Sequence, residues 1–165
     1  SEHYAILFGD PYNSDNCITR IHSACFTGDL LGSKKCDCGE QFKGAISTMQ
    51  KHEKGVLLYL NQEGRGIGLA NKMRAYHLQN MGFDTVEANH RLGFEDDERD
   101  LAIAAQILKS LNLNKIKLMT NNPRKIELLS EHGIKVAKRI PLIVKANSKN
   151  KNYLHTKAIK SGHIL

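Results

Sequence analysis

The sequence predicts one α/β domain built in three layers, with a mixed, largely parallel sheet flanked by helices. Two observations lead to this prediction. Strand-like apolar runs alternate with helical stretches along the chain. No internal repeat, low-complexity tract or Pro/Gly-rich linker divides the 165 residues, which are enough to bury a full core. We therefore expect residues 1–165 to fold as a single domain.

The first half of the chain supplies strands at its start and the first helix of the alternation. Residues 4–26 read mostly as strands, and GVLLYL at 55–60 predicts a buried strand because it is an unbroken apolar run. A helix is expected near 68–81, where apolar residues recur at helical spacing. DTVEA at 84–88 follows as the next strand-like run.

The second half continues the same alternation. A helix is expected from about 98 to 112, followed by the strand KIKLM at 115–119. The next helix, at 123–132, starts with a proline and stops at a glycine, and strand-like residues 135–144 follow it. A last helix lies near 153–162. In such folds ligands bind where loops leave the carboxyl ends of the strands.

Composition limits the classes of partner. The net charge of +7 predicts an anionic partner, either nucleic acid or a phosphorylated small molecule. With five Tyr, five Phe and no Trp, the chain offers little for a base-stacking surface. No apolar run approaches a membrane span, and no secretory pattern opens the sequence. We therefore expect a cytoplasmic protein that binds neither nucleic acid nor a membrane.

Three cysteines form the most informative motif. Cys25, Cys36 and Cys38 follow the spacing C-x10-C-x-C, and such thiolates can hold zinc with one coordination position open. Zinc lowers the pKa of water at an open position to roughly 7, which favours a catalytic metal. The alternatives are ordinary buried cysteines, disulfides, which a cytosolic setting disfavours, and a structural zinc closed by Cys17 or His22.

Cations stand at three junctions where helices begin. Arg65 precedes the first expected helix, Arg99 lies in the first turn of the next, and Arg124 and Lys125 follow an Asn-Pro cap. A cation is unfavourable at the positive end of a helix, so the repetition suggests an anion that all of them face. Helix N-termini with Arg and Lys are typical of phosphate sites. For Arg99, pairing with a neighbouring aspartate is the alternative.

Other signals are ambiguous when taken alone. The glycines of EGRGIGL do not match the dinucleotide pattern G-x-G-x-x-G and more plausibly allow close backbone approach to a ligand. Asp96 or Asp97 is either the cap of the next helix or, in a phosphate pocket, a proton acceptor or magnesium ligand. Tyr76 shares a helical stripe with Leu69 and Met73, which is more typical of a core residue than of a substrate contact.

Taken together, the motifs resemble those of GTP cyclohydrolase II, the first enzyme of riboflavin synthesis. The matching stretches cover most of the chain from about residue 20 onward, in order and without large gaps. The most specific are RIHS with the following C…CDCG, EGRGIGL and TNNP followed by a basic residue. The others are KMRAY, DTVEANHRLGF, DERD, RIPLIV and LHTKAIKSGH.

The resemblance implies a zinc enzyme that acts on GTP. One zinc ion per chain would be held by Cys25, Cys36 and Cys38. The reaction would open the guanine imidazole ring at C8, release formate, and release pyrophosphate with the help of Mg²⁺, and the enzyme would be a homodimer. In this family Tyr76 would lie near the purine, Asp97 would accept a proton, and the implied GTP contacts are Arg20, Ile21, His22, Ser23, Ala24, Gln41, Glu63, Gly64, Arg65, Thr85, Thr120 and Lys125.

The resemblance also implies that Arg99 is the nucleophile at the α-phosphate. A guanidinium keeps its proton to a pKa above about 12, so electrostatic stabilisation of the phosphate during attack by water is the physical alternative. Glu63 suits the N1–H and N2–H₂ edge of guanine, which presents only donors. Ala24 stands where members often carry Glu, and the usual N-terminal segment is expected to be shortened or absent.

Two other classes of function compete with this interpretation. A zinc-stabilised nucleic-acid-binding domain is favoured by charge but disfavoured by the few aromatic residues and by the carboxylates in its supposed binding loops. A nucleobase deaminase is disfavoured because the H-x-E…P-C-x-x-C arrangement is missing.

Overall fold

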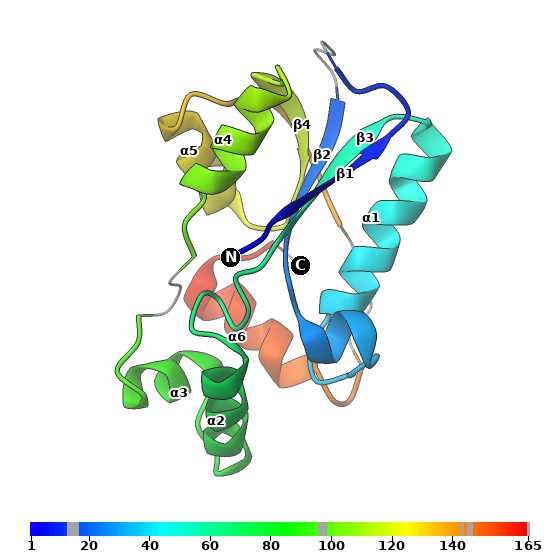
Figure 1. Cartoon of the computed structure of the whole chain (residues 1–165). Coiled ribbons are helices and arrows are strands. Elements are labelled where there is room, and N and C mark those ends of the chain that lie inside the picture. The colour runs from blue at the N-terminus through cyan, green and yellow to red at the C-terminus, as the bar shows by residue number, and fades with distance from the viewer. Residues whose placement is uncertain (13–16, 96–98, 143, 145–146, 165) are drawn as a thin grey trace.

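A five-stranded mixed sheet forms the centre of the computed structural model, which describes residues 1–12, 17–95, 99–142, 144 and 147–164 (Figure 1). The strand order is β1-β3-β2-β4-β5, with β1 antiparallel to β3 and the other neighbouring pairs parallel. The strands are β1 (Tyr4–Phe8), β2 (Cys17–Ser23), β3 (Gly55–Leu60), β4 (Lys115–Met119) and β5 (Lys135–Ile140). The predicted mixed, largely parallel sheet is confirmed.

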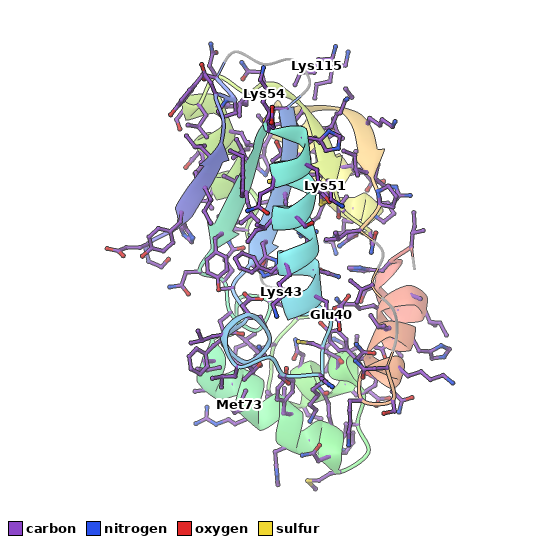
Figure 2. All side chains as sticks on the ribbon, turned by 90° about the vertical axis from the view of Figure 1, so that its right-hand side faces the viewer. Glu40, Lys43, Lys51, Lys54, Met73 and Lys115 are labelled. Atoms are coloured by element: carbon purple, nitrogen blue, oxygen red, sulfur yellow. The ribbon has the colours of Figure 1, made fainter. Side chains whose placement is uncertain are left out.

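Helices cover both faces of the sheet and its lower end. Their bounds are η1 (Phe26–Leu30, a π-helical turn), α1 (Cys38–His52), α2 (Leu69–Asn80), α3 (Thr85–Arg91), α4 (Ala102–Ser110), α5 (Pro123–Glu131) and α6 (Lys151–Ser161). Helix α1 covers one face, while α4 and α5 cover the other (Figure 1). Exposed charged side chains such as Lys43 and Lys51 point outward from α1 (Figure 2).

Two apolar clusters show why the fold has three layers. Side chains alternate between the faces of β3, so that Val56, Leu58 and Leu60 pack toward α4 and α5 while Leu57 packs toward α1. Strand β3 is buried along nearly its whole length, as expected for a strand covered on both faces. Within the described residues, no helix combines the length and apolar character needed to cross a bilayer.

The structure corrects two features of the predicted elements. Residues 84–88 are not a strand, because Asp84 and Glu87 form a capping box that begins α3 at Thr85. The expected helix at 98–112 begins later, at Ala102, where the Asp100 side chain accepts the backbone N–H of Ala102. Asp96 and Asp97 lie outside the described residues, so their proposed capping role stays a prediction.

The sequence pattern also gave no indication of helix α1. Its buried side consists of Gln41, Ala45 and Met49, so a polar side chain occupies one of the positions at which an apolar residue would mark a helical stripe.

Three helices lie apart from the layers that cover the sheet. Beyond the carboxyl ends of β2 and β3 lie α2, α3 and α6, below the sheet and its covering helices (Figure 1). On α2, Leu69 and Met73 are more than a third exposed, which rules out the predicted core stripe (Figure 2).

Candidate active site

One cavity opens at the carboxyl ends of β2, β3 and β4, where this fold class is expected to bind ligands. Its volume is about 120 Å³. The predicted site residues that line it are Arg20, His22, Ser23, Ala24, Cys25, Cys36, Cys38, Gln41, Glu63, Gly64, Arg65, Tyr76, Thr85, Arg99, Thr120 and Lys125.

Two predicted site residues are not placed in this lining. Ile21 points its side chain into the apolar core between the sheet and α4, and its carbonyl oxygen accepts a hydrogen bond from Lys125 Nζ at 3.2 Å. Strand alternation explains this, because Arg20 and His22 face the opposite side of β2. Asp97 lies outside the described residues. Their roles toward a ligand therefore stay predictions.

The three predicted thiols converge at one end of the cavity. Cys25 follows β2, while Cys36 and Cys38 lie at the start of α1. Their sulfur atoms all lie within 4.8 Å of one another, and Cys25 Sγ and Cys36 Sγ are 3.7 Å apart. Tetrahedral coordination with Zn–S bonds of about 2.3 Å requires sulfur atoms about 3.8 Å apart. The geometry therefore fits a zinc ion held by three thiolates.

Two further observations support this fit. A Cβ atom at Gly28 would lie 3.0 Å from Cys25 Sγ and 3.1 Å from Cys36 Sγ, so only glycine leaves room beside the sulfurs. Neither Cys17 nor His22 joins the cluster found among the described residues. Cys17 belongs to the apolar core, and Nε2 of His22 is engaged by Asp29. Neither residue therefore supplies the fourth ligand that a closed structural zinc site would need.

The thiol end carries negative charge that a buried lysine offsets. Hydrogen bonds from Cys36 and Cys38 lower the pKa of Cys25, to which Lys72 Nζ also donates at 2.9 Å. Lys72 is largely buried and also contacts Glu63 Oε1 at 2.6 Å. Burial alone would lower the pKa of Lys72, but the hydrogen bonds to Cys25 and Glu63 raise it. Lys72 is therefore a cation that holds two site residues together.

Asp29 braces the same end from the side of the sheet. Its carboxylate accepts hydrogen bonds from the backbone N–H of Cys25, from His22 Nε2 and from the Tyr59 hydroxyl, all at 2.9–3.0 Å. Burial lowers the pKa of His22, so this imidazole is neutral near pH 7. Because Nε2 carries the proton toward Asp29, Nδ1 is left as an acceptor, and it has no hydrogen-bond partner within the described residues.

A group of cations, called the cation end below, lines the same cavity. Arg65, Arg99 and Lys125 all line the cavity, although they belong to different parts of the chain: Arg65 precedes α2, Arg99 precedes α4, and Lys125 lies in the first turn of α5. Arg99 also reaches Ser23 Oγ at 3.4 Å. Arg99 precedes α4 rather than lying in its first turn, whereas Lys125 follows the Asn122 cap as expected. Helix starts and guanidinium groups around one space make an anion site.

Comparisons with known proteins identify the family. A family model described as GTP cyclohydrolase II matches residues 1–141. The GTP cyclohydrolase-2 of Cronobacter sakazakii is 53% identical over 164 residues, which is 99% of this chain and 83% of that protein. The GTP cyclohydrolase-2 of Azospirillum brasilense is 54% identical over 163 residues, which is 99% of this chain and 42% of that protein. The chain belongs to the GTP cyclohydrolase II family. The predicted resemblance is confirmed, and with it the assignment of the chain as a GTP cyclohydrolase enzyme.

Tyr76 occupies the thiol end of this cyclohydrolase cavity rather than the core. Its ring lies under the ammonium groups of Lys35 and Lys72, at 4.5 and 5.7 Å from the ring centroid. Burial raises the pKa of Tyr76 to about 12, so the hydroxyl stays protonated and can donate a hydrogen bond near pH 7. Gln79 and Asn89, from α2 and α3, line the same region.

The last helix supplies residues that sequence reasoning missed. Tyr153, Lys157 and His163 line the cavity from α6 and the segment that follows it. Lys157 Nζ pairs with Asp37 Oδ1 at 2.8 Å, far from it in sequence. Burial, together with the positive charges of Lys157, Arg65, Lys125 and Arg99, lowers the pKa of His163 to about 3. In the sequence this segment is basic and predicts a helix near 153–162, but nothing in it indicates these contacts.

Proposed function

We propose that this GTP cyclohydrolase uses zinc to open the imidazole ring of GTP at C8, with release of formate, and also releases pyrophosphate. The product would be 2,5-diamino-6-(5-phosphoribosylamino)pyrimidin-4(3H)-one, so the reaction would be the first committed step of riboflavin synthesis. The observation that carries this proposal is the single cavity that is lined by both a thiol cluster and a group of cations, in a chain of this family.

The thiol end would serve ring opening. Zinc held by Cys25, Cys36 and Cys38 would supply a Lewis acid that lowers the pKa of water at its open coordination position to roughly 7. Lys72 donates to Cys25 Sγ and so offsets part of the negative charge of three thiolates. Asp29 holds the backbone of Cys25 in place.

Tyr76 and Glu63 would hold the purine. Tyr76, protonated near pH 7, would donate a hydrogen bond to the ring system. Glu63 would accept from the donor edge of guanine, although its oxygens already accept from the Phe26 and Gly64 backbone N–H groups and from Lys72. A carboxylate has about four acceptor positions, so about one remains for the base. Adenine would be rejected because its N1 is an acceptor and would face the carboxylate of Glu63, which is also an acceptor.

The cation end would hold the triphosphate together with Mg²⁺. Arg65, Arg99 and Lys125 would bind its oxygens through charge-assisted hydrogen bonds. In this proposal Asp97 accepts a proton, and Arg99 acts at the α-phosphate either as nucleophile or by electrostatic stabilisation of water attack. A phosphoramidate trapped on Arg99 would support the first role, whereas direct entry of labelled water oxygen without an adduct would support the second.

The remaining residues carried over from the resemblance would complete the nucleotide site. Backbone and side-chain groups of residues 20–24, Gln41, Thr85 and Thr120 would contact GTP. The backbone N–H of Ala24 already donates to Leu60 O at 2.7 Å, which leaves its carbonyl for a ligand. A homodimer and a cytoplasmic location are part of the same proposal.

The test is incubation of zinc-loaded enzyme with GTP and Mg²⁺, followed by measurement of formate, pyrophosphate and ammonia. The proposal expects formate and pyrophosphate in equal amounts, with formate release proportional to zinc content per chain. Ammonia in place of formate would indicate a deaminase. No turnover, combined with salt-sensitive binding of RNA or DNA, would indicate a nucleic-acid-binding domain instead.

A further inference from the structure

A buried chain of hydrogen bonds links the last helix to the nucleotide site. Lys157 Nζ contacts Asp37 Oδ1 at 2.8 Å, and Asp37 Oδ2 accepts from Gln41 Nε2. Gln41 Oε1 then accepts from the Arg20 guanidinium at 2.8 Å. The Lys157 and Asp37 side chains are only 9% and 4% exposed. This chain of hydrogen bonds therefore runs through the protein interior, from α6 across the start of α1 to β2.

Asp37 and Arg20 determine which groups donate and which accept along these hydrogen bonds. A carboxylate can only accept and a guanidinium can only donate, so the amide of Gln41 must turn its nitrogen toward Asp37 and its oxygen toward Arg20. Arg20 is held further by a hydrogen bond to the carbonyl of Met119 at 3.1 Å. Arg20 and Gln41 both line the cavity. Any change in the charge state of the Asp37 site would thus reach groups that face the ligand.

Stability alone does not account for this arrangement. A buried ion pair contributes little to stability compared with apolar residues of similar size, because both charges lose their hydration. The network also leaves Arg20 Nε without a hydrogen-bond partner in the described part of the chain. The ion pair between Lys157 and Asp37 would be enough to attach α6 to the start of α1. The further hydrogen bonds to Gln41 and to Arg20 in the cavity wall are not needed for that attachment.

We infer that Lys157 and Asp37 are positioning residues of the nucleotide site: the lysine holds the carboxylate, and the carboxylate orients Gln41 and, through it, Arg20 toward the ligand. The inference rests on the proposed function, since GTP is the ligand assumed. It assigns the C-terminal helix, which lies beyond the matched family range of residues 1–141, to substrate binding rather than to packing alone.

An exchange of donor and acceptor tests the direction of the chain. In Asp37→Asn, the new amide nitrogen would face Gln41 Nε2, so Gln41 would turn over and present a donor to Arg20. We expect KM for GTP to rise about tenfold, the equivalent of one charge-assisted hydrogen bond, with kcat changed less. The double variant D37N/Q41E keeps the total charge and restores an acceptor for Arg20. It should return KM to within about threefold of wild type.

The position of Asp37 between two proposed zinc ligands makes zinc content the necessary control. Zinc per chain in Asp37→Asn should equal that of the wild type. Loss of zinc from this variant would overturn the inference, because the effect on GTP would then come from the metal. Failure of the double variant to improve on Asp37→Asn, with both variants folded and zinc-loaded, would overturn it as well.

A second set of variants tests the lysine. Lys157→Met should raise KM about as much as Asp37→Asn, whereas Lys157→Arg, which keeps the positive charge, should recover most of the loss. The control is Lys151→Gln, on an exposed position of the same helix, and its KM should equal that of the wild type. Lys157→Met and Asp37→Asn combined should be no worse than either alone by more than about twofold. Additive losses would mean that Lys157 contacts the phosphates directly, and the inference would be wrong.

Formate release by the wild-type enzyme is measured before any variant. If the wild type released no formate from GTP, the proposed function would fail. If the wild type is active and the variant pattern is absent, only the positioning role fails.

Discussion

The thiol end and the cation end of the cavity are assembled in different ways. Cys25, Cys36 and Cys38 come from one short segment that joins β2 to α1, and local hydrogen bonds fix that segment. The cation end takes its residues from three separate junctions, which only the folded sheet brings together. One end is therefore local in sequence, whereas the other depends on the whole fold.

This difference should appear in the response to mutation. A metal held by three ligands depends on each of them, so loss of one thiol removes the function of the whole end. Several cations that surround one anion share its charge, so loss of one weakens binding without abolishing it. Effects should therefore be largest at the thiol end and graded at the cation end.

The largest effect is expected from Cys36→Ser. Removal of one thiolate should release zinc and lower formate production to below about one thousandth of the wild-type rate, while GTP still binds through the cation end. Metal content per chain and formate yield measure this directly. Cys17→Ala, which removes a buried thiol outside the cluster, is the matched control and should keep its zinc. Full formate release by Cys36→Ser would mean that the metal assignment is wrong.

Arg99→Ala tests the cation end and should have the next largest effect. If Arg99 stabilises charge at the α-phosphate, as the proposed function holds, its removal should reduce pyrophosphate release by about 10²–10³-fold. Zinc content should not change, because the thiol end is assembled separately. Pyrophosphate is measured enzymatically, with Arg74→Ala on an exposed position of α2 as control. An equal loss of zinc and of pyrophosphate release would show that the two ends are not independent.

Tyr76→Phe probes the proposed purine site. The variant keeps the ring beneath Lys35 and Lys72 but loses the hydroxyl donor, so ring opening should slow about tenfold, the equivalent of one hydrogen bond. Melting temperature should change little. Tyr4→Phe, at a residue that is half exposed, serves as control. A large fall in the melting temperature with unchanged turnover would show that the role of Tyr76 is structural.

The sequence was most informative where chemistry is local. The thiol spacing and the cations at helix starts could be found without coordinates, because each lies within a few residues of a recognisable motif. The capping box at Asp84 and Glu87 was also present in the sequence, but the β-branched residues within 84–88 favoured a strand. Helix α3 packs against α2, which is close in sequence, and against α6, which is far away, so the second contact could not be read from the local pattern.

Lys72, Asp37 and Lys157 could not be predicted, for a physical reason. Lys72 lies on a helix in which apolar, polar and charged residues are mixed on every side, so nothing in the pattern separates a buried lysine from an exposed one. Asp37 and Lys157 stand at opposite ends of the chain, and their pairing depends on how α6 packs against the start of α1. An ion pair between distant residues produces no periodic pattern in the sequence, so only the tertiary structure reveals it.

The smallest expected effect is a dependence of stability on pH at the cation end. The pKa of His163 falls to about 3 in the native protein, against about 6.5 in the unfolded chain, so the histidine contributes most above pH 6.5. As the pH drops below 6.5 the unfolded chain takes up a proton that the native state does not, and stability is lost. Between pH 7 and pH 5 the wild type should lose about 1 kcal/mol more than His163→Gln, after allowance for solvent screening of a partly exposed group.

Urea denaturation at both pH values measures this loss, with His155→Gln, at an exposed position of α6, as the matched control. The control should retain the full dependence on pH. If His163→Gln retains it as well, neither burial nor the positive charge of Lys157, Arg65, Lys125 and Arg99 lowers the pKa of His163 in the native protein. The cation end would then be open to solvent, and its cations would bind a triphosphate more weakly than charges in a partly buried site do.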